Sequence, residues 1–210
     1  QTASLRLIVV APATAIQARE LAKQFGAEVV DDPKTGISEA INCGIRAKNG
    51  EEFYAWMGDD DLFRPEGLER LQGLLDKNPQ AVVAYGGCDY IDPSGKVLAQ
   101  SAAGKLAQIL LPWGPDLIPH PGSMIRLDAL EQIGMFDPAL KYAMDLDAFL
   151  KLKKLGKFVY TREIVSAFRW HPDSLTVANR RNSSLESEAV KAKHLPRVLR
   201  PIRFIWQYPI

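Results

Sequence analysis

The first half of the chain alternates short apolar runs with segments of helical periodicity. Leu5–Ala11 is a β-branched apolar run that predicts a buried strand, and Ala15–Phe25 has the apolar spacing of an amphipathic helix. Further strands are expected at Ala27–Val30, Glu52–Met57, Ala81–Tyr85, Cys88–Ile91 and Val97–Ala99, with helices at Ser38–Ala47 and Pro65–Lys77. This alternation predicts an α/β fold with a mostly parallel central sheet.

The order of elements changes in the second half. Strands are expected at His120–Arg126, Phe158–Tyr160 and Ile164–Trp170, and helices at Gly104–Leu111, Leu127–Ile133, Ala143–Leu155 and Ser184–His194. No linker divides the chain. We therefore expect one main domain at residues 1–178, followed by a C-terminal helix and tail at residues 179–210.

The composition is that of a globular protein and does not by itself indicate a function. The chain has 210 residues, 47% hydrophobic and 24% charged, with a net charge of +1, which is ordinary for a globular protein and gives no electrostatic reason to expect nucleic-acid binding. An anionic ligand would need a metal or a few placed cations.

Cys43 and Cys88 lie far apart without a CxxC spacing. We expect two reduced thiols in a cytoplasmic protein, with a single disulfide as the alternative.

The strongest chemical signal is the acidic triplet Asp59-Asp60-Asp61, which directly follows a predicted strand. In open α/β sheets, ligands bind at the carboxyl ends of the strands. Magnesium and manganese prefer oxygen ligands and often combine one or two carboxylates with phosphate oxygens. The triplet therefore predicts a metal that bridges the protein and a diphosphate. The alternative is that Asp60 or Asp61 caps the helix expected to begin at Pro65.

Four ordered segments carry a family resemblance. They are Gly36–Ile45, Gly58–Pro65, the run from His120–Arg126 through Gly134-Met135-Phe136-Asp137 to Ala143–Asp147, and Arg169–Thr176. Together they resemble the inverting family 2 glycosyltransferases, over residues 5–178. The resemblance implies a Rossmann-like GT-A (nucleotide-diphospho-sugar transferase) fold, with a small antiparallel part on the acceptor side.

The resemblance also implies an activity and a set of site residues. A hexosyl group would pass, with inversion, from a nucleoside diphosphate sugar to a hydroxyl group of a glycan or lipid-linked acceptor, with Mn or Mg as cofactor. The implied residues are Asp145 as catalytic base, Asn42, Asp59 and Arg169 for the donor, His120 and Asp147 on the acceptor side, and Asp60, Asp61 and His171 for the metal, in a DXD-type motif. Asp60 would be the principal metal ligand.

Each of these residues also has a plainer interpretation. Asp145 could be the N-cap of the helix that follows it. His171 could be a strand-end histidine bonded to the backbone, and Arg169 could form a surface ion pair. His120 and Asp147 could be structural, while Asn42 is expected to anchor a loop near the nucleotide by hydrogen bonds.

The chain also departs from the family pattern. Leu5–Ala11 aligns best with the second strand of the family, so the first β-α unit is expected to be missing. Ala11-Pro12-Ala13-Thr14 then stands where the family has a carboxylate for the nucleoside, and Met144 stands where it often has Glu. The alternative function is therefore a catalytically degenerate relative that binds a sugar nucleotide or a protein partner.

The C-terminal tail, Leu195–Ile210, mixes arginine with large apolar and aromatic residues. This composition is typical of a peripheral contact with a membrane surface, here the inner face. Pro196, Pro201 and Pro209 prevent one long amphipathic helix. The alternative is a tail that packs on its own domain or on a second subunit in a homodimer.

Overall fold

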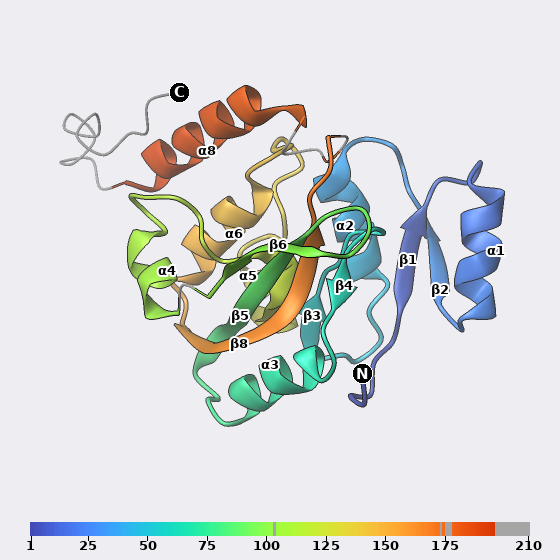
Figure 1. Cartoon of the computed structure of the whole chain (residues 1–210), viewed down its shortest axis with the longest axis horizontal. Helices are drawn as coiled ribbons and strands as arrows, with labels where there is room; N and C mark the ends of the chain where they lie inside the picture. Colours follow the sequence, from blue (N-terminus) through green and yellow to red (C-terminus); the bar gives the residue numbers. More distant parts are fainter. Residues whose placement is uncertain (103, 173, 175–177, 196–210) are drawn as a thin grey trace.

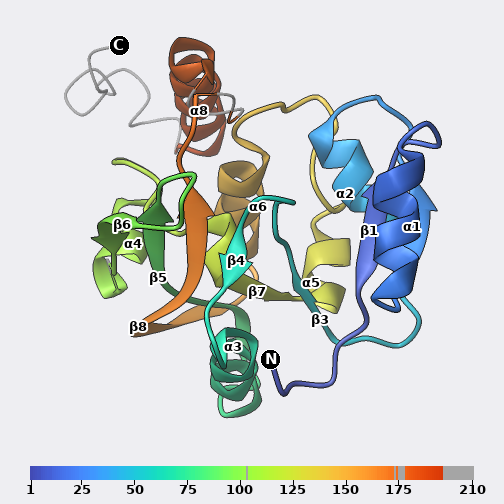
Figure 2. The same ribbon diagram turned by 45° about the vertical axis from the view of Figure 1, so that its right-hand side comes forward.

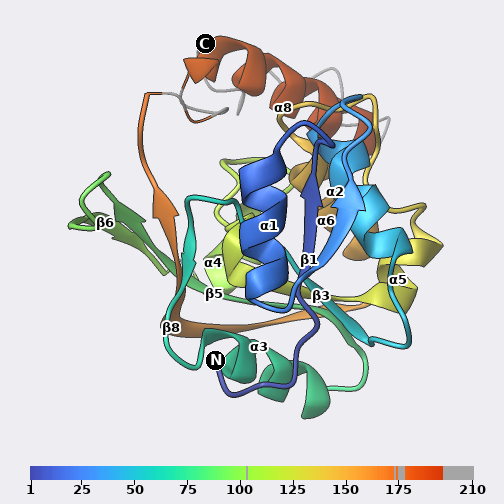
Figure 3. The ribbon, with the colours of Figure 1, turned by 90° about the vertical axis from the view of Figure 1, so that its right-hand side faces the viewer.

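The computed structural model describes residues 1–102, 104–172, 174 and 178–195, and it has an α/β architecture with two sheets (Figure 1). The smaller sheet pairs β1 (Ile8–Ala11) with β2 (Glu28–Asp31) in parallel, and α1 (Ile16–Gln24) packs against it. Figure 3 shows α1 in front of these two strands. Most of the tail, residues 196–210, lies outside the described residues.

The larger sheet is mixed rather than mostly parallel, which corrects the expected pairing. Its strands follow the order β3 (Phe53–Ala55), β7 (Ser123–Arg126), β5 (Ala81–Ile91), β8 (Lys157–Arg169) and β4 (Leu62–Phe63), with β6 (Val97–Ser101) on β5. Only the β5–β8 pair is parallel. β7 runs in the opposite direction to both of its neighbours, β3 and β5, while β6 returns antiparallel to β5 and β4 lies antiparallel to β8.

Two long strands replace four short ones that the sequence predicts. The strands expected on either side of Gly86-Gly87 are one strand, β5. The glycines allow β8 to approach closely, because a Cβ atom on Gly86 would lie 2.6 Å from Cγ1 of Val165. β8 similarly unites the two strands that were expected around residues 158–170.

Helices cover both faces of the large sheet. The main core lies on the face with α2 (Ile37–Arg46), α4 (Lys105–Leu110), α5 (Leu127–Gln132), α6 (Met144–Leu152) and α8 (Arg180–His194). A smaller core lies under α3 (Gly67–Asp76) on the other face. Successive residues of β5 alternate between the cores, with Val83 and Tyr85 in the first and Ala84 in the second, as the period of a strand requires.

Strand direction brings several segments to one edge of this sheet. β3 and β5 are both antiparallel to β7, and β8 is parallel to β5, so β3, β5 and β8 end at the same edge. The short 3-10 helix η1 (His120–Gly122), which leads into β7, begins there as well. In Figure 2, β8 points along this direction toward α8.

No helix among the described residues is long and apolar enough to span a membrane.

Candidate active site

The three carboxylates of the triplet lie in different environments. Asp59 is exposed, Asp60 is half-buried and Asp61 is buried. One carboxylate oxygen of Asp61 accepts a hydrogen bond of 2.9 Å from the backbone N–H of Arg169, at the end of β8. Burial raises the pKa of Asp61 to about 6. Neither Asp60 nor Asp61 caps a helix, since the N-cap of α3 is Glu66.

Asp60 and His171 form the pair best suited to a metal ion. Nε2 of His171 lies 2.7 Å from Oδ2 of Asp60, so the histidine contacts a side chain and not only the backbone. A Cβ atom on Gly58 would lie 3.0 Å from a carboxylate oxygen of Asp60 and 3.0 Å from one of Asp61, so both carboxylates face the surface of this glycine.

This donor set can hold a divalent ion only in part. Carboxylate and imidazole groups both ligate manganese, and carboxylates suit magnesium. Within the described residues, however, no group of three or more His, Cys, Asp or Glu side chains is arranged to hold a metal. A metal at Asp60 and His171 would therefore need oxygen atoms from phosphate and water to complete its coordination.

Arg169 holds the loop that carries the triplet. Its guanidinium donates hydrogen bonds of 2.9 Å to the backbone carbonyls of Asp60, Asp92 and Pro93. These contacts tie the end of β3 to the turn after β5. The predicted contact between Arg169 and the donor stays a prediction, since its guanidinium is engaged here mainly with the backbone.

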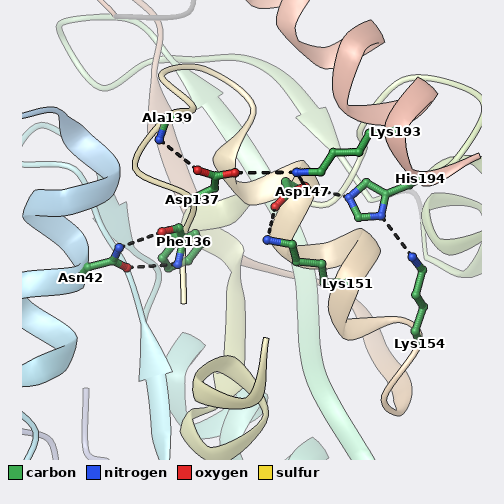
Figure 4. Close-up of polar contacts among 9 residues, drawn as sticks. All are labelled: Asn42, Phe136, Asp137, Ala139, Asp147, Lys151, Lys154, Lys193 and His194. Carbon is green, nitrogen blue, oxygen red and sulfur yellow. Dashed lines mark hydrogen bonds and ion pairs between the residues drawn. The ribbon is translucent and has the colours of Figure 1, made fainter. Parts of the chain in front are cut away.

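Asn42 is a buried link between α2 and the segment before α6 (Figure 4). Its side-chain nitrogen donates to the carbonyl of Phe136 at 2.8 Å, and its side-chain oxygen accepts from the N–H of Phe136 at 3.1 Å. It thus anchors a loop by hydrogen bonds, as expected, but the loop is that of Phe136. Direct donor binding by Asn42 stays a prediction that these contacts do not favour.

Asp145 lies in the first turn of α6, and Ala143 occupies the N-cap position, so the N-cap interpretation of Asp145 is wrong. Its carboxylate accepts a hydrogen bond of 2.8 Å from the N–H of Leu146. Burial, followed by the negative charge of Glu186, raises the pKa of Asp145. A carboxylate with a raised pKa is a stronger base, which suits proton abstraction.

An aromatic cluster packs η1 against β3 and the residue that follows it. Oη of Tyr54 lies 3.2 Å from Nε2 of His120, and the ring of His120 stacks on Trp56 with 4.7 Å between centroids. Burial lowers the pKa of His120 to about 3, so its ring is neutral. Burial and the charge of Asp145 raise the pKa of Tyr54 well above its usual value, which keeps the phenol protonated.

Asp147, two residues after Asp145, is a buried ion-pair partner (Figure 4). Its carboxylate lies 2.7 Å from Nε2 of His194, 2.6 Å from Nζ of Lys151 and 3.8 Å from Nζ of Lys193. Burial opposes ionisation, but hydrogen bonds from His194 and Lys151 lower the pKa of Asp147 to about 2. These contacts favour a structural role, and positioning of the acceptor stays a prediction.

The structure also adds polar residues that sequence reasoning missed. Asp116, in the segment before η1, has a raised pKa because of burial and the nearby charge of Asp145. Glu186 and His194 of α8 contact the backbone before α6 and the side chain of Asp147. No local pattern in the sequence singles these residues out, since α8 also carries Glu188, Lys191 and Lys193.

The sequence is similar to those of known glycosyltransferases. A family model described as Glycosyl transferase family 2 matches residues 6–134, which is more than half of the chain. An uncharacterized glycosyltransferase of Rickettsia typhi, RT0329, is 26% identical over 204 residues, covering 93% of this chain and 64% of the relative. The chain thus spans less than two thirds of that relative, and 57% of a second one from Rickettsia prowazekii.

Solved structures of low identity share the fold. The mannosyltransferase PcManGT of Pyrobaculum calidifontis, in complex with GDP-Man and Mn2+, superposes with a TM-score of 0.67 at 17% identity, covering 95% of this chain and 59% of that one. Glucosyl-3-phosphoglycerate synthase of Mycobacterium tuberculosis, with Mn2+, UDP-glucose and phosphoglyceric acid, gives 0.62 at 18% identity, covering 88% and 68%. These similarities confirm the expected GT-A fold.

Proposed function

Because this chain belongs to glycosyl transferase family 2, we propose that it transfers a sugar, with inversion, from a nucleoside diphosphate donor to a hydroxyl group of an acceptor. The observation that carries the proposal is the placement of two groups. The Asp60–His171 pair follows the ends of β3 and β8, and Asp145 lies near enough to Tyr54, a residue of β3, for its charge to raise the pKa of the phenol.

The residues divide the chemistry between them. Asp145 takes the proton from the acceptor hydroxyl, whose oxygen then forms a bond to the anomeric carbon as the bond from that carbon to the diphosphate breaks. Attack on the side opposite the leaving group inverts the anomeric centre. Asp60 and His171 would hold Mn or Mg, which supplies positive charge to the departing diphosphate when bound. The acceptor is proposed to be a glycan or a lipid-linked sugar.

Donor binding is the first test. Thermal unfolding would be followed with UDP-glucose and with GDP-mannose, each with and without Mn²⁺. A ligand at about 100 times its Kd stabilises a protein by about 2.7 kcal/mol, which is an increase in Tm of about 5–10 °C for a chain of this size. If neither nucleotide sugar raises Tm in the presence of Mn²⁺, the proposal loses its support for these donors.

Transfer is the second test, with Asp145→Asn as the variant. We expect turnover to fall at least about 100-fold, the usual contribution of a general base, while donor binding persists. Asp128→Asn is a matched control, because Asp128 also lies in the first turn of a helix and accepts a hydrogen bond from the next N–H, but it is exposed. Equal turnover in the two variants would remove Asp145 from the mechanism.

One observation favours a second function, binding without transfer. Ala11 ends β1, and neither it nor Pro12-Ala13-Thr14 after it supplies a carboxylate to a nucleoside there. A catalytically degenerate relative would bind a sugar nucleotide, with the same increase in Tm, yet show no turnover with any acceptor.

A further inference from the structure

Helix α8 supplies the hydrogen-bond acceptor for the backbone that leads into α6. Oε1 of Glu186 accepts hydrogen bonds from three consecutive N–H groups, those of Lys141 at 3.0 Å, Tyr142 at 2.6 Å and Ala143 at 2.8 Å. The first N–H groups of a helix have no partner within the helix, and the N-cap residue of α6, Ala143, has no side chain that could accept one. Glu186, 43 residues away, instead fixes the backbone just before the helix, at its N-cap residue and the two residues that precede it.

A second contact attaches α8 further along α6. His194, at the end of α8, lies 2.7 Å from the buried carboxylate of Asp147. Val190, between the two contacts, is buried in the main core. Attachment at both places prevents α8 from sliding independently of α6, so the position of Glu186 sets the position of the backbone at Ala143.

We propose that Glu186 is a positioning residue for Asp145, which holds the backbone entering α6 in place and so fixes the position of the base carboxylate in its first turn. The proposal rests on the function proposed above, in which Asp145 is the base. Ala143 is only two residues from Asp145, so release of its N–H would allow the backbone that enters the first turn to shift. A displacement of about 1 Å at a reacting group can cost about 100-fold in rate.

Glu186 also acts on Asp145 through its charge. The titratable groups that face Asp145 are Glu186 from α8, Asp116 from the segment before η1 and Tyr54 from β3. Asp147, on the same helix, is paired with Lys151 and contacts His194. Removal of the Glu186 charge should therefore make Asp145 easier to ionise, although burial, the larger cause of its raised pKa, remains.

Two variants separate the charge of Glu186 from its hydrogen bonds. Glu186→Gln keeps an acceptor oxygen and removes the charge, whereas Glu186→Ala removes both. Glu188→Gln is the control, since Glu188 lies on the same helix and pairs with Lys191 at 2.8 Å. Carbon NMR of the Asp145 carboxyl group against pH, and amide hydrogen exchange at Tyr142 and Ala143, report on the full chain without any substrate.

In Glu186→Gln we expect the pKa of Asp145 measured by NMR to fall by about half to one pH unit. The midpoint of the acid limb of the kcat/KM profile should fall by the same amount. In Glu186→Ala we expect faster exchange at Tyr142 and Ala143 and a kcat about 10–100-fold lower at all pH values. An unchanged titration in Glu186→Gln, or unchanged exchange in Glu186→Ala, would overturn the proposal. If Glu186→Ala does not fold, the titration of Glu186→Gln decides alone. Absence of transfer by the wild type would instead overturn the function and leave the NMR test standing.

Discussion

The buried carboxylate of Asp147, which pairs with Lys151 and contacts His194, predicts a stability that depends on pH. The side chain of Asp147 is 1% exposed and that of His194 is 8% exposed, so solvent screens their interaction little. Asp147→Asn preserves the shape of the side chain but removes its charge. The neighbouring Nζ of Lys151, 2.6 Å from the carboxylate, then loses its counterion.

The magnitude follows from the lowered pKa. The shift of the Asp147 pKa from 3.8 to about 2 corresponds to about 2 units, and each unit is worth about 1.4 kcal/mol. The charged form therefore contributes about 2–3 kcal/mol to the free energy of unfolding. Removal of one partner from a buried pair typically costs about 3–5 kcal/mol, so we expect a loss of about 3 kcal/mol at pH 7. For a chain of this size, Tm should fall by about 6–12 °C.

The sign of the pH dependence is fixed by the direction of that shift. A carboxyl group whose folded pKa is lowered stabilises the fold above its unfolded pKa, and this contribution disappears as pH falls through the folded value. The difference between wild type and Asp147→Asn should therefore be constant above about pH 5 and shrink between about pH 4 and pH 2.

Urea unfolding followed by far-UV circular dichroism, at a series of pH values, measures both quantities. Asp137→Asn is the matched control, because Asp137 also faces Lys193 at 3.8 Å but is 30% exposed (Figure 4). Exposed pairs contribute about 0–1 kcal/mol, so the control should lose less than about 1 kcal/mol. The reasoning is refuted if both variants lose the same free energy at pH 7, or if the Asp147→Asn difference does not shrink in acid.

Three further predictions concern the candidate metal and catalytic groups. Asp60→Asn and His171→Ala should each abolish the Mn²⁺-dependent part of the Tm increase with a nucleotide sugar, and an undiminished increase would remove the pair from the metal site. Gly58→Ala should weaken donor binding about tenfold or more by calorimetry, because its methyl group would lie 3.0 Å from two carboxylate oxygens; wild-type affinity would contradict this. The kcat/KM of the wild type should fall as pH drops below about 6, because Asp145 acts in its ionised form, and a pH-independent kcat/KM between pH 5 and 7 would argue against a carboxylate base.

The pattern of apolar runs located most strands and helices, because burial of one face depends on local spacing. The pattern of apolar runs could not predict which strands pair with one another or in which direction. β7 is a short apolar run, and nothing in it shows that it lies antiparallel between β3 and β5; the antiparallel pairings of β6 with β5 and of β4 with β8 are equally invisible in the sequence. The fusion of two short strands into β5 depends similarly on β8, which packs over Gly86.

For the candidate site as well, the sequence predicted the residue types but not the contacts that depend on distant strands and helices. The family resemblance identified Asp60 and His171, which are 111 residues apart in sequence and in contact in the fold. It could not tell which carboxylate of the triplet is buried, because the burial of Asp61 depends on the end of β8. Glu186 escaped notice for a physical reason: its partners are backbone N–H groups, which any sequence provides.

Asp145 and Asp147 show why environment, and not residue type, separates a base from a structural acid. Residues i and i+2 of a helix point to different faces. His194 and Lys151 gather at Asp147 and lower its pKa, whereas the described part of the chain places no ion-pair partner on Asp145, whose pKa is raised. Two carboxyl groups whose pKa values are pushed apart in this way mark a division of roles. The groups that contact Asp147, Lys151 of α6 and His194 of α8, thus make no contact with Asp145, which leaves it free to accept a proton.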